Sequence, residues 1–163
     1  MGSKSSLKLE RLLQDGYRYA LCLTHHPTKA EDLLQDAWLA VIKAKGPHEK
    51  GYLFSAIRTR FINHNKRELL VPIISIEEDE IGGEEALVGV ADISIDDNEL
   101  EKSLGILRPV EREALYLSVV EGFTADEIAS RTDRSRGTVL SLIHRSKKKL
   151  KDYLDQEQRE VKL

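Results

Sequence analysis

Residues 124–150, TADEIASRTDRSRGTVLSLIHRSKKKL, contain two short helical patterns separated by a polar turn. Thr124 and Glu127 are spaced as in a capping box, in which each side chain satisfies an N–H group at the start of a helix. Ser135 is suited to cap a second helix. The apolar residues of that second helix recur at helical spacing: Val139, Leu142, Ile143 and Leu150. The order of helix, turn and helix predicts a helix-turn-helix motif.

The second helix of this motif is strongly basic. Residues 134–151 contain seven basic residues and no acidic one, which suits a helix that lies against phosphates. A basic run alone is often just a solvated helix face. Because this run follows a capped helix and a tight turn, the combination favours a DNA-recognition helix.

Length and composition favour a helical protein. The 163 residues are enough for one ordinary domain or two small ones. Hydrophobic residues make up 40% of the chain and charged residues 33%, whereas aromatic residues make up only 6%. This balance argues against a large aromatic β core, so we expect an all-α fold.

Cysteine usage and hydropathy bear on the cellular compartment. Cys22 is the single cysteine, so an intramolecular disulfide framework is excluded. No apolar run approaches the roughly 20 residues that a membrane span requires, and we expect a cytoplasmic protein.

His25 and His26 lie near Cys22, but a fourth ligand at suitable spacing is missing, so we expect a helix end here and no metal.

The net charge of −3 is unevenly distributed along the chain. Residues 71–106 carry 11 acidic residues and one basic residue, whereas residues 1–70 and 107–163 each carry more basic than acidic residues. The middle segment has no sustained apolar period and contains Pro72 and the pair Gly82-Gly83, as is typical of a linker. We therefore expect two small helical domains, residues 1–70 and 107–163, joined by an acidic flexible linker.

The first domain has the pattern of three amphipathic helices. Residues 7–23 place their apolar side chains on one side of a helix. A second helix is expected to begin at Thr28, in a capping box with Glu31, and to stop at Gly46 and Pro47. A third helix follows, and its end is rich in amide and basic side chains: Asn63, His64, Asn65, Lys66 and Arg67.

The second domain is expected to begin with a helix that supports the helix-turn-helix. Pro109 suits the first turn of this helix, and Gly122 suits its end. Between them, apolar residues that include Val119 and Val120 are expected to pack the helix against the rest of the domain.

These segments carry a resemblance to a known family. KAEDLLQDAWLAVIKA and GYLFSAIRTRFINHNKRE, residues 29–44 and 51–68, resemble region two of bacterial RNA polymerase sigma factors of the extracytoplasmic-function (ECF) group. LRPVEREALYLSVVEGFTADEIASRTDRSRGTVLSLIHRSKKKL, residues 107–150, is similar to region four of the same proteins. The resemblance implies an alternative sigma factor, which binds core RNA polymerase, reads the −35 duplex and captures melted −10 bases without a cofactor.

The resemblance also implies three sets of binding residues, for the polymerase β′ clamp helices, for the −10 element and for the −35 element, with a further contact between region four and the β flap. Residues implied in core polymerase binding are Asp32, Gln35, Asp36 and Leu39. Residues implied in −10 binding are Arg58, Arg60, Asn63, His64, Lys66 and Arg67. Residues expected in −35 binding are Arg134, Ser135, Arg136, Thr138, Ser141, Arg145, Lys147 and Lys148.

The recognition helix departs from the family at two positions. Leu140 and Leu142 stand where the family usually has basic residues. Binding of DNA weakens with salt, and the slope of log K against log salt concentration reflects the number of phosphate contacts. Loss of two such contacts would reduce this slope by roughly two, unless the neighbouring cations compensate. An exposed apolar patch at these positions would suit an anti-sigma factor. The alternative function is therefore a sigma mimic that sequesters an anti-sigma factor without binding DNA.

An enzyme is not indicated by the sequence. We find no glycine-rich phosphate loop, no set of metal ligands and no pair of a nucleophile with a base. The expected partners are core polymerase, promoter DNA and an anti-sigma factor.

Overall fold

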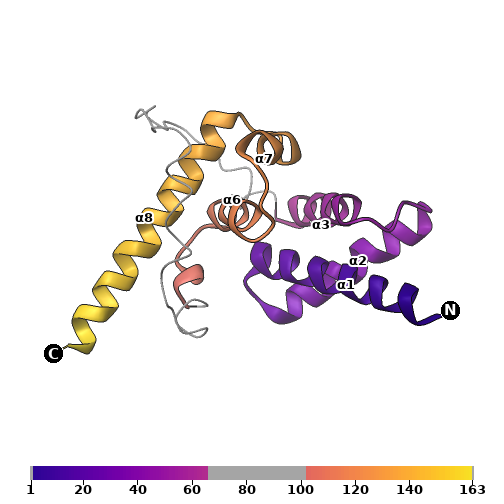
Figure 1. Cartoon of the computed structure of the whole chain (residues 1–163), viewed down its shortest axis with the longest axis horizontal. Coiled ribbons are helices and arrows are strands. Elements are labelled where there is room, and N and C mark those ends of the chain that lie inside the picture. The colour runs from indigo at the N-terminus through magenta and orange to yellow at the C-terminus, as the bar shows by residue number, and fades with distance from the viewer. Residues whose placement is uncertain (1, 66–101, 163) are drawn as a thin grey trace. The chain divides into compact units, whose positions relative to one another are not determined.

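The computed structural model describes residues 2–65 and 102–162. These residues belong to two compact units, which meet in sequence between Val71 and Pro72. All regular structure in the described residues is α-helical (Figure 1), which confirms the all-α expectation. Residues 71–101 of the expected linker lie outside the described residues, as do Lys66 and Arg67.

The first unit consists of α1 (Gly2–Thr24), α2 (Pro27–Lys43) and α3 (Lys50–His64), which pack against one another (Figure 1). The rings of Tyr19 on α1 and Phe54 on α3 stack in the core with centroids 4.4 Å apart. A Cβ atom at Gly16 would lie 2.8 Å from a methyl group of Leu53 and 2.9 Å from one of Leu34. The absence of a side chain at Gly16 therefore allows α2 and α3 to approach α1 closely.

Helix α2 has its N-cap two residues earlier than the sequence pattern indicated, because the expected capping box places the cap at Thr28. Its N-cap is His26, whose Nδ1 accepts a hydrogen bond from the backbone N–H of Lys29 at 3.4 Å. The expected capping box of Thr28 and Glu31 is wrong, because Pro27 takes the first helical position. A proline there forfeits no hydrogen bond, and its fixed φ angle suits the first turn of a helix.

The second unit consists of α6 (Pro109–Val119), α7 (Ala125–Thr132) and α8 (Arg136–Val161). Helices α6 and α7 pack against the first part of α8, which continues past them toward the C-terminus (Figure 1). Residues 102–105 are also helical, and Leu104 packs against a core cluster of Leu107, Leu115 and Leu150. The packed structure of this unit thus begins before residue 107, where the sequence pattern placed its start.

Helix α6 starts as expected and ends sooner than expected. Pro109 occupies its first turn, and the N–H of Arg108 donates to Glu111 Oε2 at 3.4 Å. The helix ends at Val119, and Gly122 adopts a φ of 71° in the turn that follows. Val119 and Val120 are 46% and 60% exposed, so the expectation that they pack this helix is wrong. The apolar pattern in the sequence continues past the point where the chain turns.

The helix-turn-helix forms with the caps that the sequence predicted. Thr124 Oγ1 accepts from the N–H of Glu127 at 3.2 Å at the start of α7. Ser135 Oγ accepts from the N–H of Thr138 at 3.1 Å at the start of α8. Between the helices, Asp133 adopts the left-handed conformation with a φ of 53°, which aspartate tolerates better than most residues.

Candidate functional site

One face of α2 presents the four residues that were assigned to polymerase binding. Asp32, Gln35, Asp36 and Leu39 are all exposed, and their spacing of three, four and seven residues places them on one side of the helix. Leu39 keeps 53% of its surface exposed. This face is therefore acidic at one end and apolar at the other, whereas the opposite face of α2 is buried in the core.

A cavity of about 210 Å³ opens beside this face. It lies where the end of α1, the start of α2 and the end of α3 meet. Its lining residues are Thr24, Lys29, Asp32, Leu33, Asp36, Phe61, His64 and Asn65. The cavity brings two residues of the polymerase set, Asp32 and Asp36, together with His64 of the −10 set. Asn65 belongs to the polar cluster predicted at the end of the third helix, but it is not among the residues implied in −10 binding.

The residues assigned to the −10 element do not share one face of α3. Arg58 and Arg60 are both half-buried. They are two positions apart, and two steps along an α-helix correspond to a rotation of about 200° around its axis. They therefore flank the buried stripe from opposite sides. Asn63 and His64 are exposed at the C-terminal end of α3.

The loop between α2 and α3 contacts both helices, and the first residue of α3, Lys50, lies near α1. The ring of Trp38 on α2 lies 4.9 Å from that of His48, measured between centroids. Lys50 Nζ lies 3.5 Å from Asp15 Oδ2 on α1. The ring of Tyr52 occupies the space where a side chain at Gly46 would start. These contacts give the loop a defined shape.

The first half of α8 has one buried side and one exposed side. Val139, Leu142 and Ile143 are at most 2% exposed. The expectation that Leu142 faces DNA is therefore wrong, because its helical phase is that of the core. Leu140 is half-exposed, and it lies on the same side as the exposed Arg136 and His144. His144 was missed by the sequence assignment, although a helical wheel anchored on Val139 and Ile143 predicts its exposure.

The residues expected to contact −35 DNA differ in exposure. Ser135, Arg136 and Lys148 are exposed, and Arg134, Thr138, Arg145 and Lys147 are half-buried. Burial lowers the pKa of Lys147. Arg136 Nε lies 3.6 Å from Asp126 Oδ1, so this guanidinium is near a carboxylate of α7. Ser141 is only 5% exposed, which argues against its place in a DNA-contacting surface.

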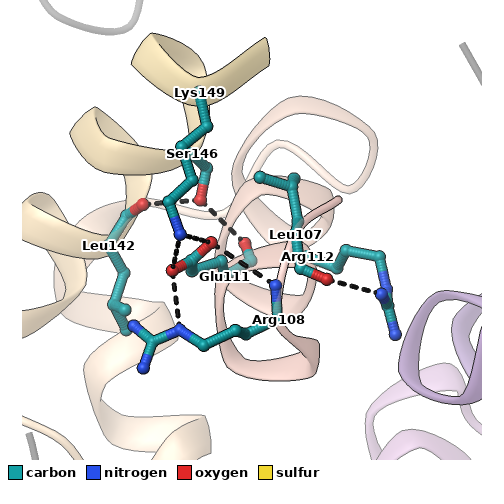
Figure 2. A network of polar contacts seen from close by, with 7 residues as sticks. All are labelled: Leu107, Arg108, Glu111, Arg112, Leu142, Ser146 and Lys149. Atoms are coloured by element: carbon teal, nitrogen blue, oxygen red, sulfur yellow. Dashed lines mark hydrogen bonds and ion pairs between the residues drawn. The ribbon is translucent and has the colours of Figure 1, made fainter. Parts of the chain in front are cut away.

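A buried carboxylate lies beneath the basic end of this surface (Figure 2). The side chain of Glu111, on α6, is completely buried. Its oxygens accept from Lys149 Nζ at 2.8 and 3.0 Å, and Oε1 accepts from Arg108 Nε at 2.8 Å. Burial alone would raise the pKa of Glu111, but the hydrogen bonds and charges of Lys149 and Arg108 outweigh it, so the pKa is lowered.

Two further polar side chains, those of Ser146 and Arg112, make hydrogen bonds beside this carboxylate (Figure 2). The buried hydroxyl of Ser146 lies 2.6 Å from the carbonyl oxygen of Leu142 and 3.1 Å from that of Glu111. Arg112 Nη1 donates to the carbonyl oxygen of Leu107 at 2.7 Å. The start of α6 is thus joined by hydrogen bonds both to α8 and to the segment before α6.

We expect the stability of the second unit to depend on acid pH through Glu111. The pKa of this group is lower in the folded protein than its ordinary value of 4.5. The ionised carboxylate therefore stabilises the fold above that pH, and the contribution is lost as pH falls through the folded pKa. Chemical denaturation followed by circular dichroism below pH 5 should show a steeper loss of stability in the wild-type chain than in Glu111→Gln. Parallel curves for the two proteins would contradict this assignment.

No helix in residues 2–65 and 102–162 is long and apolar enough to cross a membrane. Across the same ranges, no three His, Cys, Asp or Glu side chains gather closely enough to hold a metal ion.

The geometry defines a helix-turn-helix protein that carries a second helical unit with an exposed acidic and apolar face. Comparison with known families assigns both units. Residues 9–68 match the profile of sigma-70 region 2, and residues 97–150 match that of sigma-70 region 4. The second match begins within the segment that the sequence pattern assigned to the linker.

Individual relatives agree with these profiles. The RNA polymerase sigma factor CarQ of Myxococcus xanthus is 32% identical over 137 residues, which cover 81% of this chain and 78% of CarQ. The ECF RNA polymerase sigma factor SigE of Mycolicibacterium smegmatis is 28% identical over 148 residues, which cover 85% of this chain and 56% of SigE. The chain therefore spans little more than half the length of SigE.

The fold has a counterpart among solved structures. The sigma factor RpoE of Bartonella quintana, solved in complex with the anti-sigma factor NepR, matches with a TM-score of 0.65 and 24% identity. The match covers 93% of this chain and 97% of RpoE. The chain belongs to the sigma-70 family of RNA polymerase sigma factors, in its ECF group. Members of this family are factors of transcription initiation.

Proposed function

We propose that this chain is an alternative sigma factor that binds core RNA polymerase and directs it to specific promoters. The observation that carries the proposal is the presence of two different exposed surfaces in one chain, in the order that the family requires. The first is the acidic and apolar face of α2, and the second is the basic exposed side of α8.

The α2 face is suited to dock on a basic and apolar helical surface, which in this family is provided by the β′ clamp helices. Asp32 and Asp36 supply negative charge that speeds and orients the encounter. Leu39 supplies an exposed apolar side chain that gains free energy on burial. In this proposal the second unit makes a further contact with the β flap.

Both units take part in reading the promoter. In the second unit, Arg136, His144 and Lys148 form the exposed side of α8 that enters the −35 duplex, supported by the half-buried Arg145 and Lys147. In the first unit, the end of α3 and the loop before it contact the melted −10 strand. Stacking or pocketing of an unpaired base contributes about 1–3 kcal/mol, so binding alone drives strand opening, without nucleotide hydrolysis.

The same proposal specifies compartment and regulation. Bacterial RNA polymerase and chromosomal DNA are cytoplasmic, so a chain with this function works in the cytoplasm. RpoE, which shares the fold, was solved with an anti-sigma factor, and this supports an anti-sigma factor as the regulator of this chain. A sigma mimic that never touches DNA is less well supported, because Leu142 is buried and leaves Leu140 as the one apolar substitution on the exposed side of α8.

Binding to core polymerase tests the proposal. When the full chain is mixed with purified bacterial core RNA polymerase and separated by size-exclusion chromatography, we expect an equimolar complex. Elution of the two components in separate peaks at micromolar concentration would argue against the proposed function.

A further inference from the structure

The basic run at the end of the recognition helix contains one lysine that differs from its neighbours. Lys148 and Lys149 are both exposed, but the amino group of Lys149 is held by both oxygens of the buried Glu111 carboxylate at 2.8 and 3.0 Å. Figure 2 shows the Lys149 side chain reaching from α8 to the start of α6. The sequence alone makes these two lysines equivalent, but the structure does not.

Glu111 contacts α8 through both its side chain and its backbone. Its carboxylate accepts from Lys149, and its backbone carbonyl lies 3.1 Å from the hydroxyl of Ser146. Residues 146 and 149 are three positions apart, so they lie on the same side of α8. Both contacts therefore constrain the rotation of α8 about its own axis.

The rotation of α8 decides which side chains can reach DNA. An α-helix is a stiff element, so a rotation at Ser146 and Lys149 is transmitted to the turns that begin at Arg136. Apolar contacts through Val139 and Ile143 hold the helix against the core, but hydrophobic contacts are not directional. Hydrogen bonds to a buried carboxylate are directional, and buried ion pairs in some proteins fix a unique arrangement without adding much stability.

We propose that Glu111 is a positioning residue for the recognition helix, and that Lys149 is its anchor on α8 and makes no contact with DNA phosphate. Arg108 completes the site by donating to the same carboxylate from the cap of α6. This role rests on the proposed function, because it assumes that the exposed side of α8 reads DNA.

Three single variants test this role: Glu111→Gln, Lys149→Gln and the matched control Lys148→Gln. Each would be assembled as the full chain on core polymerase. Affinity would be measured over a range of salt concentrations for a duplex that the wild-type holoenzyme enriches from a random library, and for an unrelated duplex. Far-UV circular dichroism at the assay temperature would establish that each variant is folded.

The two classes of lysine should behave differently. Lys148→Gln is expected to weaken binding to both duplexes alike. The salt slope, which is the slope of log K against log salt concentration, should fall in magnitude by about 0.9, as for one lost phosphate contact. Lys149→Gln and Glu111→Gln are expected to leave the slope unchanged and to lower the ratio of selected to unrelated affinity by about tenfold. A double variant that combines Glu111→Gln with Lys149→Gln should lose no more selectivity than either single variant, because the two residues act as one unit.

Other results would overturn the role. A salt slope reduced in Lys149→Gln as much as in Lys148→Gln would make Lys149 a phosphate ligand. Unchanged selectivity in folded Glu111→Gln would mean that the carboxylate only stabilises the unit. If substitution by glutamine prevents folding, Lys149→Met is the alternative, because it keeps an apolar stem without the charge. Unchanged selectivity in Lys149→Met would likewise mean that the pair with Glu111 only stabilises the unit. A wild-type holoenzyme without any preference would instead refute the proposed function, and this role with it.

Discussion

Leu142→Arg is expected to destabilise the second unit strongly, whereas Leu140→Arg is expected to leave its stability unchanged and to tighten DNA binding. Leu142 is 1% exposed, and its carbonyl oxygen accepts from the hydroxyl of Ser146 at 2.6 Å. An arginine at this position would put an uncompensated charge in the core, which costs about 3–5 kcal/mol. Because small domains are stable by only about 5–15 kcal/mol, this cost should remove a large share of the second unit's stability and lower its unfolding temperature.

Circular dichroism and tryptophan fluorescence together separate this effect from general unfolding. Trp38 is the only tryptophan in the chain and lies in the first unit, so its fluorescence should follow an unchanged unfolding transition in Leu142→Arg. Helical signal from the second unit should be lost at lower temperature. A wild-type transition in both signals would mean that residue 142 is not in the core.

Leu140→Arg is the matched variant on the same helix. Leu140 is half-exposed on the side of Arg136 and His144, so its replacement adds one cation to the proposed DNA surface. The salt slope of DNA binding should increase by about 0.9. An unchanged slope would mean that this side of α8 does not face phosphate.

Charge reversal on α2 should have the largest effect on polymerase binding. In the double variant Asp32→Arg with Asp36→Arg, two exposed carboxylates become cations on the face proposed to meet the β′ clamp helices. Like charges placed opposite each other across an interface cost several kcal/mol. The Kd for core polymerase should therefore rise by about 100-fold or more, which corresponds to about 3 kcal/mol.

A charge reversal elsewhere in the first unit provides the control. Glu10→Arg alters an exposed position of α1, and it should change the Kd by less than about threefold, as expected of a charge outside the interface. Fluorescence anisotropy of the labelled chain, titrated with core polymerase, would give the Kd of the wild type, of the double variant and of Glu10→Arg. Equal losses in both variants would show a general electrostatic effect and no specific docking face.

Local rules predicted much of the fold. The caps of Thr124 and Ser135 lie where the sequence placed them, because a cap depends on residues only three positions apart. The N-cap of α2 is His26, two residues before the predicted Thr28, because Pro27 takes the first helical position. Val119 and Val120 were missed because apolar character continues through the end of a helix.

At Leu142, helical spacing and the resemblance to the family lead to different predictions. Its spacing from Val139 and Ile143 predicted burial, whereas comparison with the family suggested a position that faces DNA. The structure agrees with the spacing, since Leu142 is buried with both neighbours. For this helix, the periodicity of the chain itself was the better guide to which side meets the core.

No pattern in the sequence predicts that Glu111 pairs with Lys149. The two residues are 38 positions apart, and nothing in the sequence distinguishes Lys149 from Lys147 or Lys148. Only the packing of α6 on α8 brings the carboxylate to one lysine of the run. The cavity lined by Asp32, Asp36 and His64 likewise depends on how three helices meet, which no single segment encodes.

Run-off transcription tests the central claim most directly. Core RNA polymerase would be combined with this chain on a library of promoter fragments from the source genome. We expect discrete transcripts that require the chain and disappear with the double variant Asp32→Arg and Asp36→Arg. Absence of any transcript on every template, together with tight binding of the chain to an anti-sigma factor, would contradict its role as a working sigma factor.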